Sequence, residues 1–368
     1  MKKIIISIVI VLFVIACTAD GAWDFLSNQA DIFQALNNYD NRIKVTINNS
    51  SQDENLTNFP VLVILNTSKV TYSTISADGS GIKFISSDFT KELSYEVEEW
   101  NPGGDSFFWV KIPSITALSN SEYFWIYLST ESNTNSTNST DVWSNNYLAV
   151  WHMNDTDGTM KDSSTSGLDG IADFMGGPGP VTGTIAGAQN FTNNAAKVTI
   201  TPSTALDNLS QGTYSFWMFD NGYNDQDIIL KKGSFEIKLL NTETIDFFVN
   251  YDGGSDLEIA FDSSWAAAVW RSFHLTWTGG SGFNTIDIFA DGLELTASSI
   301  HTNGNGNRIS DTGVDLIIGN DSLNAHSFLG LLDEIRISGF VRSPAWIKAQ
   351  YLSMTDTFLT YETEEEVP

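Results

Sequence analysis

The chain has 368 residues and a formal net charge of −27 at pH 7, from 45 acidic and 18 basic side chains. This charge excludes a nucleic-acid-binding surface, because contacts with phosphate need Lys and Arg. Apolar residues make up 42% of the chain and aromatic residues 12%, which is enough for real hydrophobic cores and excludes a disordered protein.

Residues 1–16 have the pattern of an export signal. Lys2 and Lys3 precede an apolar stretch that runs from Ile4 to Ala16, and positive charges before a short apolar run are typical of a signal peptide. The stretch is shorter than the ~20 residues that a membrane-spanning helix needs. We therefore expect residues 1–16 to be a signal peptide that is removed on export.

The apolar stretch ends in Val14-Ile15-Ala16-Cys17, which resembles the lipobox of bacterial lipoproteins. The resemblance implies cleavage before Cys17 and a lipid on its sulfur, which would anchor the chain to a membrane of the cell envelope. Cys17 is the only cysteine, so this role gives the lone thiol a use. Thr18 follows in place of the aspartate that retains many lipoproteins at the inner membrane, which favours the outer membrane. The alternative is an ordinary signal peptide with a chance cysteine.

The region after the anchor divides into a spacer and a first β domain. Residues 17–40 are the expected spacer, with one or two turns of amphipathic helix between Asp24 and Asn38. Over residues 41–130, apolar and polar side chains alternate in short runs separated by Gly, Asn and Asp. Period-two alternation is typical of strands with one buried face, so we expect an antiparallel β-sandwich. The predicted strands lie at 43–47, 60–65, 81–85, 93–98, 107–112 and 123–128.

A second β domain is expected beyond a linker. Residues 131–141 contain no apolar side chain and predict a polar linker. The β pattern returns over residues 142–352 with many strands, which suits a large two-sheet jelly roll. Ser343 fits the N-cap and Pro344 the first position of one short helix near the end. Residues 353–368 are expected to be an acidic tail, frayed from Glu362 to Pro368. The predicted fold class is therefore all-β, with two β-sandwich domains and a short C-terminal helix.

Three segments of the second domain carry a family signature. They are Asp162 to Gly170, Trp270 to Trp277 with the Asp291-Gly292 hairpin, and Gly330 to Ser338 with the helix that follows. Together they resemble laminin-G-like, concanavalin A-like jelly rolls. Residues 41–130 are similar to a bacterial domain of unknown function that often precedes such a jelly roll. The resemblance implies the fold, whereas such domains bind glycans, bind proteins or serve as spacers.

The resemblance also implies a calcium site. The family often holds Ca²⁺ between the early Asp-Ser-Ser loop and the Asp-Glu of a late strand, which makes Asp162 and Asp333 the candidate ligands, with Asp169 as a third. Calcium needs clustered oxygen ligands of this kind. The alternative is structural: Asp162 would cap a turn, and Asp333 would pair with Arg336 or with a backbone amide.

Polar loops of the second domain suggest a ligand-binding rim. Tyr223, Asp225, Asp252 and Arg308 lie in predicted long loops. Sugars stack on aromatic rings and form hydrogen bonds with carboxylates and guanidinium groups, so these residues are the candidates for ligand binding. The alternative is that each is an ordinary solvated loop residue.

No catalytic residue is predicted. Glycosidases with concanavalin A-like folds use two closely spaced carboxylates, typically Glu-x-Asp-x-Glu on one strand, and that spacing does not occur. The four histidines form no His-Glu-x-x-His motif, and no Gly-x-Ser-x-Gly sequence occurs. The sequence therefore favours a non-enzymatic recognition module that binds a glycan or surface polymer. The alternatives are a structural or assembly protein that binds other envelope proteins and, less favoured, a glycoside hydrolase.

Overall fold

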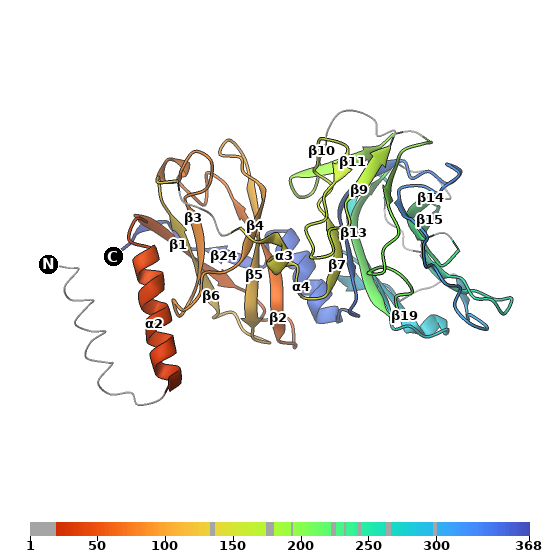
Figure 1. The fold of residues 1–368 in the computed structure, drawn as a ribbon, viewed down its shortest axis with the longest axis horizontal. Coiled ribbons are helices and arrows are strands. Elements are labelled where there is room, and N and C mark those ends of the chain that lie inside the picture. The colour runs from red at the N-terminus through yellow and green to blue at the C-terminus, as the bar shows by residue number, and fades with distance from the viewer. Residues whose placement is uncertain are drawn as a thin grey trace. The chain divides into compact units, whose positions relative to one another are not determined.

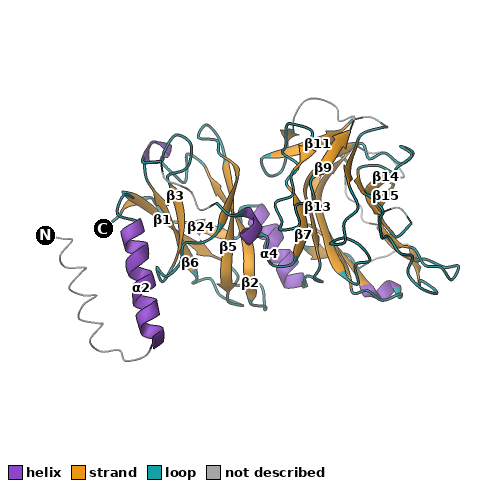
Figure 2. Cartoon of the chain, viewed as in Figure 1, coloured by secondary structure: helices purple, strands orange, loops and turns teal. Residues whose placement is uncertain are grey.

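The computed structural model describes the chain from residue 20 to its end, apart from short internal gaps. The described ranges are 20–132, 137–173, 180–192, 194–221, 226–231, 233–241, 244–262, 266–296 and 300–368. Two compact units divide the chain: residues 139–355 form the second, and the first combines the preceding residues with 356–368. Strands are the main regular structure of both units (Figure 2).

The first unit contains two antiparallel sheets. Its elements are α2 (Asp20–Ala35), β1 (Asn41–Ile47), β2 (Leu56–Leu65), η1 (Tyr72–Thr74), β3 (Ile82–Ser86), β4 (Tyr95–Glu99), β5 (Ser106–Ile115), β6 (Tyr123–Leu128), β24 (Leu359–Tyr361) and β25 (Glu365–Glu366). One sheet has the order β24-β1-β6-β3, with β25 also paired to β1, and the other has the order β2-β5-β4. The six strands predicted between residues 41 and 130 are all present, β6 with the predicted ends and the other five with shifted ends. In β1 the alternating Ile43, Val45 and Ile47 are buried, as period two requires.

The C-terminal segment belongs to the first unit, and the expectation that Glu362 to Pro368 is frayed is wrong, because β25 pairs with β1 through Glu365 and Glu366. β24 pairs with β1 through Leu359 opposite Ile47 and Tyr361 opposite Val45, and Figure 1 shows this blue strand among those of the first unit. The hydroxyl of Tyr361 also accepts a hydrogen bond from the N–H of Ile64 (3.1 Å). Apolar residues inside the tail thus complete a sheet whose other strands lie more than 200 residues earlier in the chain.

The helix of the first unit is longer than the one or two turns expected. α2 has 16 residues, and the segment that follows it packs against β3 and β6 through Leu36 and Tyr39, which are buried beside Ile85 and Tyr127. Phe33 of α2 stacks on Phe89, with ring centroids 5.2 Å apart. The described part of the expected spacer is therefore packed structure.

The expected linker is also partly structured. Thr137 pairs with Tyr95, and the N–H of Asn138 donates to the carbonyl of Tyr95 (2.8 Å). A short helix, α3 (Ser139–Val142), follows and begins the second unit. The boundary between the units therefore lies between residues 138 and 139.

The second unit is a jelly roll of two large antiparallel sheets. Its strands are β7 (Tyr147–Trp151), β8 (Thr159–Met160), β9 (Gly170–Asp173), β10 (Val181–Thr182), β11 (Gly187–Phe191), β12 (Lys197–Ile200), β13 (Gly212–Asp220), β14 (Gln226–Lys231), β15 (Phe235–Asn241), β16 (Thr244–Val249), β17 (Leu257–Asp262), β18 (Trp270–Trp277), β19 (Ile286–Ala290), β20 (Leu293–Glu294), β21 (Ile300–Thr302), β22 (Leu316–Ile318) and β23 (Gly330–Ser338), with the 3-10 turn η2 (Phe283–Thr285). The eight-stranded sheet runs β10-β11-β23-β13-β18-β19-β20, with β7 also on β23, and the nine-stranded sheet runs β21-β17-β16-β15-β14-β22-β12-β9-β8. One continuous apolar core includes residues from both sheets, among them Trp151, Phe216, Phe247 and Ile318.

Two local signals in the second unit act as predicted. Asp291 and Gly292 form the two-residue loop between the paired Ala290 and Leu293, and both have positive φ (51° and 72°), as a type I′ hairpin turn requires. Near the end, α4 (Pro344–Met354) begins with Ser343 as N-cap, whose hydroxyl accepts the N–H of Trp346 (3.1 Å). The short C-terminal helix is therefore confirmed.

Replacing Phe358 tests the role of the C-terminal segment. Phe358 is fully buried and its ring lies 5.9 Å from that of Phe59 in β2. We expect Phe358→Ala to lower the free energy of unfolding of the first unit by about 3–5 kcal/mol, since it leaves a cavity. Calorimetry should show the loss of stability only in the unfolding transition of the first unit. Leu118→Ala, at a side chain that is 67% exposed, is the control; equal effects of the two changes would contradict the pairing.

Candidate functional site

The face of the nine-stranded sheet that points away from the core carries a row of mostly charged side chains. Asp227 of β14 lies opposite Lys238 of β15, Lys238 lies opposite Asp246 of β16, and Asp246 lies opposite Ala260 of β17. Residues directly opposite each other in an antiparallel pair point to the same face. The register therefore gathers residues from four strands into one row.

A second row lies beside the first on the same face. Leu230 lies opposite Glu236, Glu236 opposite Phe248, and Phe248 opposite Glu258. The alternate side chains of these strands point the other way, into the core; they include Ile237, Leu239, Ile245, Phe247, Val249, Leu257 and Ile259. We call the eight residues of the two rows the outer face.

Asp246 lies at the centre of the outer face in an unfavourable setting for a charge. It is 2% exposed, and its Oδ1 has no hydrogen-bond partner among the described residues. Burial raises the pKa of Asp246 to about 8; the carboxylates of Glu258 and Glu236 add to the rise, and Lys238 opposes it. At neutral pH this carboxyl group is therefore protonated and able to donate as well as accept a hydrogen bond.

The neighbours of Asp246 supply charge, an aromatic surface and access to solvent. The ammonium of Lys238 pairs with Glu236 and lies 5.6 Å from the ring centroid of Phe248. The side chains of Glu236 and Lys238 are 19% and 25% exposed, so solvent reaches the outer face beside the buried carboxyl group. Burial also raises the pKa of Asp227, to about 6.

The calcium candidate Asp162 is already saturated with hydrogen bonds. Its Oδ1 accepts the N–H groups of Val150 and Ser164 (2.9 Å each), and its Oδ2 accepts the Ser164 hydroxyl (2.9 Å) and the N–H of Leu168 (2.7 Å). An ionised carboxylate offers about four lone-pair sites, and all of them are used. The geometry is that of the structural alternative, in which Asp162 caps a turn.

The other two calcium candidates are also engaged locally. Asp169 accepts the N–H of Asp162 (2.9 Å) and pairs with Lys161 (3.1 Å). Asp333 accepts the N–H groups of residues 184 and 185, and its Oδ1 is buried without a partner among the described residues. Burial, together with the adjacent Glu334, raises its pKa. Neither group of three potential metal ligands within the described ranges includes Asp162, Asp169 or Asp333, and calcium binding by them stays a prediction.

Two of the four residues expected on a ligand-binding rim, Asp252 and Arg308, lie on paired segments, since Tyr251 forms a β-bridge with Arg308. Tyr223 and Asp225 lie outside the described residues. Asp252 is exposed, and its carboxylate accepts the backbone N–H of Asn307 (2.7 Å) and its side-chain amide (3.3 Å). This pairing connects two loops of the second unit.

Arg308 is partly buried and makes several contacts within the second unit. Its guanidinium donates to the Ser234 hydroxyl and to Asp311 (2.8 Å each) and to the carbonyl of Leu209, and lies 5.0 Å from the ring centroid of Trp277. Asp311 is fully buried and needs this compensation, since an unpaired buried charge is costly. Both terminal nitrogens of Arg308 are thus used inside the unit, and ligand binding by Arg308 stays a prediction.

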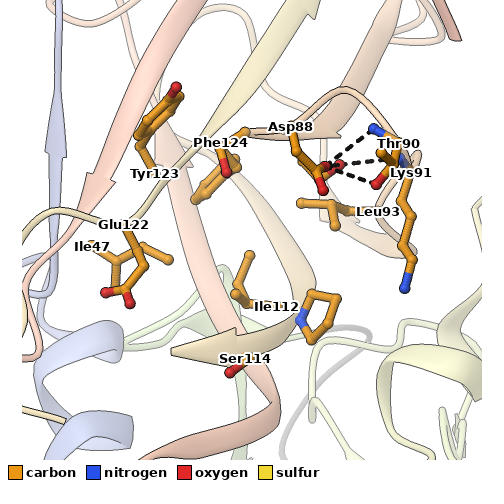
Figure 3. Close-up of a pocket in the computed structure, with 13 residues that line it drawn as sticks. Ile47, Asp88, Thr90, Lys91, Leu93, Ile112, Ser114, Glu122, Tyr123 and Phe124 are labelled. Carbon is orange, nitrogen blue, oxygen red and sulfur yellow. Dashed lines mark hydrogen bonds between the residues drawn. The ribbon is translucent and has the colours of Figure 1, made fainter. Parts of the chain in front are cut away.

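A small pocket lies in the first unit, between the start of β6 and the segment that joins β3 to β4 (Figure 3). Its volume is about 220 Å³, with apolar lining from Ile47, Leu93 and Ile112 and polar lining that includes Lys91 and Glu122. Pockets for drug-sized ligands have volumes of about 300–1,000 Å³. This pocket is smaller, and the outer face of the second unit is the better candidate.

The loop beside the pocket is held by its own side chains. The carboxylate of Asp88 accepts the N–H of Thr90 (3.1 Å), the hydroxyl of Thr90 (2.8 Å) and the hydroxyl of Ser86 (2.7 Å), as Figure 3 shows in part. These bonds use Asp88 to shape the loop, which leaves it less available to a ligand.

Two family models match the chain. The Concanavalin A-like lectin/glucanases superfamily matches residues 192–348, and the domain of unknown function DUF2341 matches residues 78–165. The chain therefore contains a concanavalin A-like domain, preceded by a domain of unknown function. The second match ends inside the second unit, beyond the boundary at residue 138. The resemblance drawn from the sequence motifs is confirmed.

Several solved structures are similar in fold. The binding domain of Paraclostridial Mosquitocidal Protein 1 is 14% identical, with a TM-score of 0.44 over 56% of this chain and 52% of that one. The botulinum neurotoxin serotype D binding domain is 14% identical, with a TM-score of 0.42 over 59% and 52%. The binding domain of botulinum neurotoxin DC in complex with SialylT is 13% identical, with a TM-score of 0.41 over 57% and 52%. The aligned part spans about half the length of these chains. No curated protein matches the chain.

No helix among the described residues is long and apolar enough to cross a membrane.

The residues of the outer face were not among the sequence candidates. A signal was present, because Glu236 and Lys238 alternate with apolar residues and Asp246 interrupts an apolar run. What the sequence lacks is the register that puts them side by side.

The raised pKa of Asp246 makes stability depend on pH. The ordinary pKa of an aspartate is 3.8. The contribution of Asp246 to the free energy of unfolding is therefore complete below about pH 4, and it is lost as the pH rises toward 8. We expect Asp246→Asn to match the parent melting temperature at pH 4 and to exceed it at pH 9. Asp287→Asn, at an exposed position of β19, is the control. Melting curves that stay parallel from pH 4 to pH 9 would contradict the assignment.

Proposed function

We propose that the chain is a non-catalytic recognition module of the cell envelope, whose second unit binds carbohydrate or a similar hydroxyl-rich surface polymer through the outer face. The observation that carries the proposal is the buried carboxyl group of Asp246, whose Oδ1 has no partner among the described residues. A buried polar atom without a partner costs about 1–3 kcal/mol. A ligand hydroxyl that bonds to this group would remove that cost.

The surroundings of Asp246 suit a sugar. Phe248 offers an apolar ring for the C–H face of a pyranose, and Glu236, Lys238 and Glu258 offer charged acceptors and donors for its hydroxyl groups. Binding sites typically combine an apolar surface with a few converging polar groups in this way. The family model, which is named for both lectins and glucanases, is consistent with such a role.

Glycoside hydrolysis is the second candidate, and one observation favours it. A glycosidase acid must keep its proton near neutral pH while a second carboxylate nearby stays ionised. Asp246, with a pKa of about 8, meets the first condition, and Glu236 or Glu258 on the neighbouring strands would supply the second group.

The binding proposal predicts that Phe248 contributes to affinity. Phe248→Ala should weaken binding to the polysaccharide that the parent binds by about tenfold, equivalent to ~1.4 kcal/mol. Binding would be measured with a panel of purified bacterial surface polysaccharides and peptidoglycan. Phe340→Ala, at an aromatic residue that is 46% exposed elsewhere in the second unit, is the control.

The outcomes separate the functions. Retention of polysaccharide without turnover supports the recognition module, and turnover that is lost in Asp246→Asn supports the hydrolase. If no polysaccharide binds and the chain instead co-purifies with a stoichiometric envelope protein, the assembly role replaces both.

We further propose that a lipid on Cys17 anchors the chain at the outer membrane. The Val14-Ile15-Ala16-Cys17 sequence and Thr18 support this placement. Cells that express the parent chain should incorporate labelled palmitate into it and retain it in the membrane fraction, whereas Cys17→Ser should lose both. A parent chain without label would contradict the anchor and leave the binding proposal unaffected.

A further inference from the structure

A cluster of possible metal ligands lies where β14 begins, beside the segment that joins β22 to β23. Nδ1 of His326 is 3.2 Å from Oδ2 of Asp321 and 3.8 Å from Oδ2 of Asp227. One ligand atom from each of the three side chains lies within 4.8 Å of the others. None of these residues was a sequence candidate.

The backbone holds the three side chains in place. The N–H of Asp227 donates to the carbonyl of His326 (2.8 Å), which ties the strand to the segment. Oδ1 of Asp321 accepts the N–H groups of Leu323 (2.9 Å) and Ala325 (2.8 Å), which leaves its Oδ2 facing His326. The cluster is therefore pre-organised by β14 and by a tight turn.

The carboxylate of Asp227 lies near the charge of Lys238 on the neighbouring strand, but one of its oxygens has no hydrogen bond. Asp227 is 3% exposed, its Oδ1 has no hydrogen-bond partner among the described residues, and its Oδ2 faces the imidazole. Leaving a buried charged acceptor unsatisfied is costly, and a bound cation would offset that cost. This orphaned oxygen, rather than the gathering of acidic groups, points to a missing ligand.

We propose that Asp227, Asp321 and His326 form a site for a divalent transition-metal ion of the Zn²⁺ type. Zinc binds imidazole and carboxylate at about 2.0–2.2 Å in tetrahedral geometry, which separates neighbouring ligand atoms by about 3.3 Å. The separations of 3.2 and 3.8 Å lie close to that value. A nitrogen ligand also favours transition metals over Ca²⁺, which takes oxygen ligands.

The geometry leaves one coordination position to solvent or to a ligand. The side chain of His326 is 42% exposed, so water reaches the site. The inference does not depend on carbohydrate binding, because the cluster would hold its metal whichever ligand the outer face takes. It is also distinct from the calcium site implied by the sequence, with which it shares no residue.

Calorimetric titration of the tag-free, chelator-treated full chain with ZnCl₂ tests the site. We expect one Zn²⁺ ion per chain, and at least tenfold weaker binding in Asp227→Asn and in His326→Gln. The second change is at a partly exposed side chain, so it remains informative if the first variant fails to fold. Circular dichroism establishes folding of each variant.

Matched controls are Asp252→Asn and His301→Gln, which remove an exposed carboxylate and an exposed imidazole elsewhere in the second unit. Both should bind Zn²⁺ as the parent does. Absence of saturable binding by the parent would overturn the site, as would parent-like affinity in both test variants. Ca²⁺ binding at least as tight as that of Zn²⁺ would overturn the assignment to a transition metal.

Discussion

The buried charges of β23 are the constraint on which the second unit depends. Asp333, Glu334 and Arg336 are each no more than 2% exposed, and a buried charge costs several kcal/mol unless it is paired. Arg336 pairs with Glu334, which also bonds to His152 just beyond β7 (2.6 Å), while Asp333 accepts amides of residues 184 and 185 between β10 and β11. The strand is therefore stable only with its neighbours placed around it.

The backbone of β23 shows how two adjacent acidic residues are both accommodated. Glu334 has φ +53°, and the register with β13 shifts between Ser215 and Trp217, as in a β-bulge, where two residues face one. The bulge interrupts the alternation, so Asp333 and Glu334 find different partners instead of sharing one environment. Asp246 on the nine-stranded sheet differs from these two acids, because it is buried and its Oδ1 has no hydrogen-bond partner among the described residues. Native folds satisfy nearly all buried polar groups, and exceptions tend to occur where a ligand binds.

The sequence predicts elements well and pairings poorly, for physical reasons. Alternation in 43–47 and the Ser343-Pro344 start of α4 are local signals, and both elements form as predicted. The pairing of β24 with β1 joins residues more than 300 positions apart and leaves no local trace, so the acidic composition of the tail was misleading. The candidate site follows the same rule: polar loops such as that of Arg308 are visible in the sequence, whereas the outer face arises from the register of β14 to β17.

Asp227 links the two sites proposed for the second unit. It ends the outer-face row opposite Lys238, and its carboxylate faces His326. A divalent ion on the cluster would add positive charge at one end of a face that otherwise carries Asp246, Glu236 and Glu258 around a single ammonium group. That charge would favour the ionised form of the nearby acids and thereby change which hydrogen bonds the face offers to a ligand. Because coupling between two binding sites is reciprocal, a ligand that bonds to these acids must alter metal affinity by the same factor. The shared aspartate therefore makes metal and polymer thermodynamically linked wherever both bind.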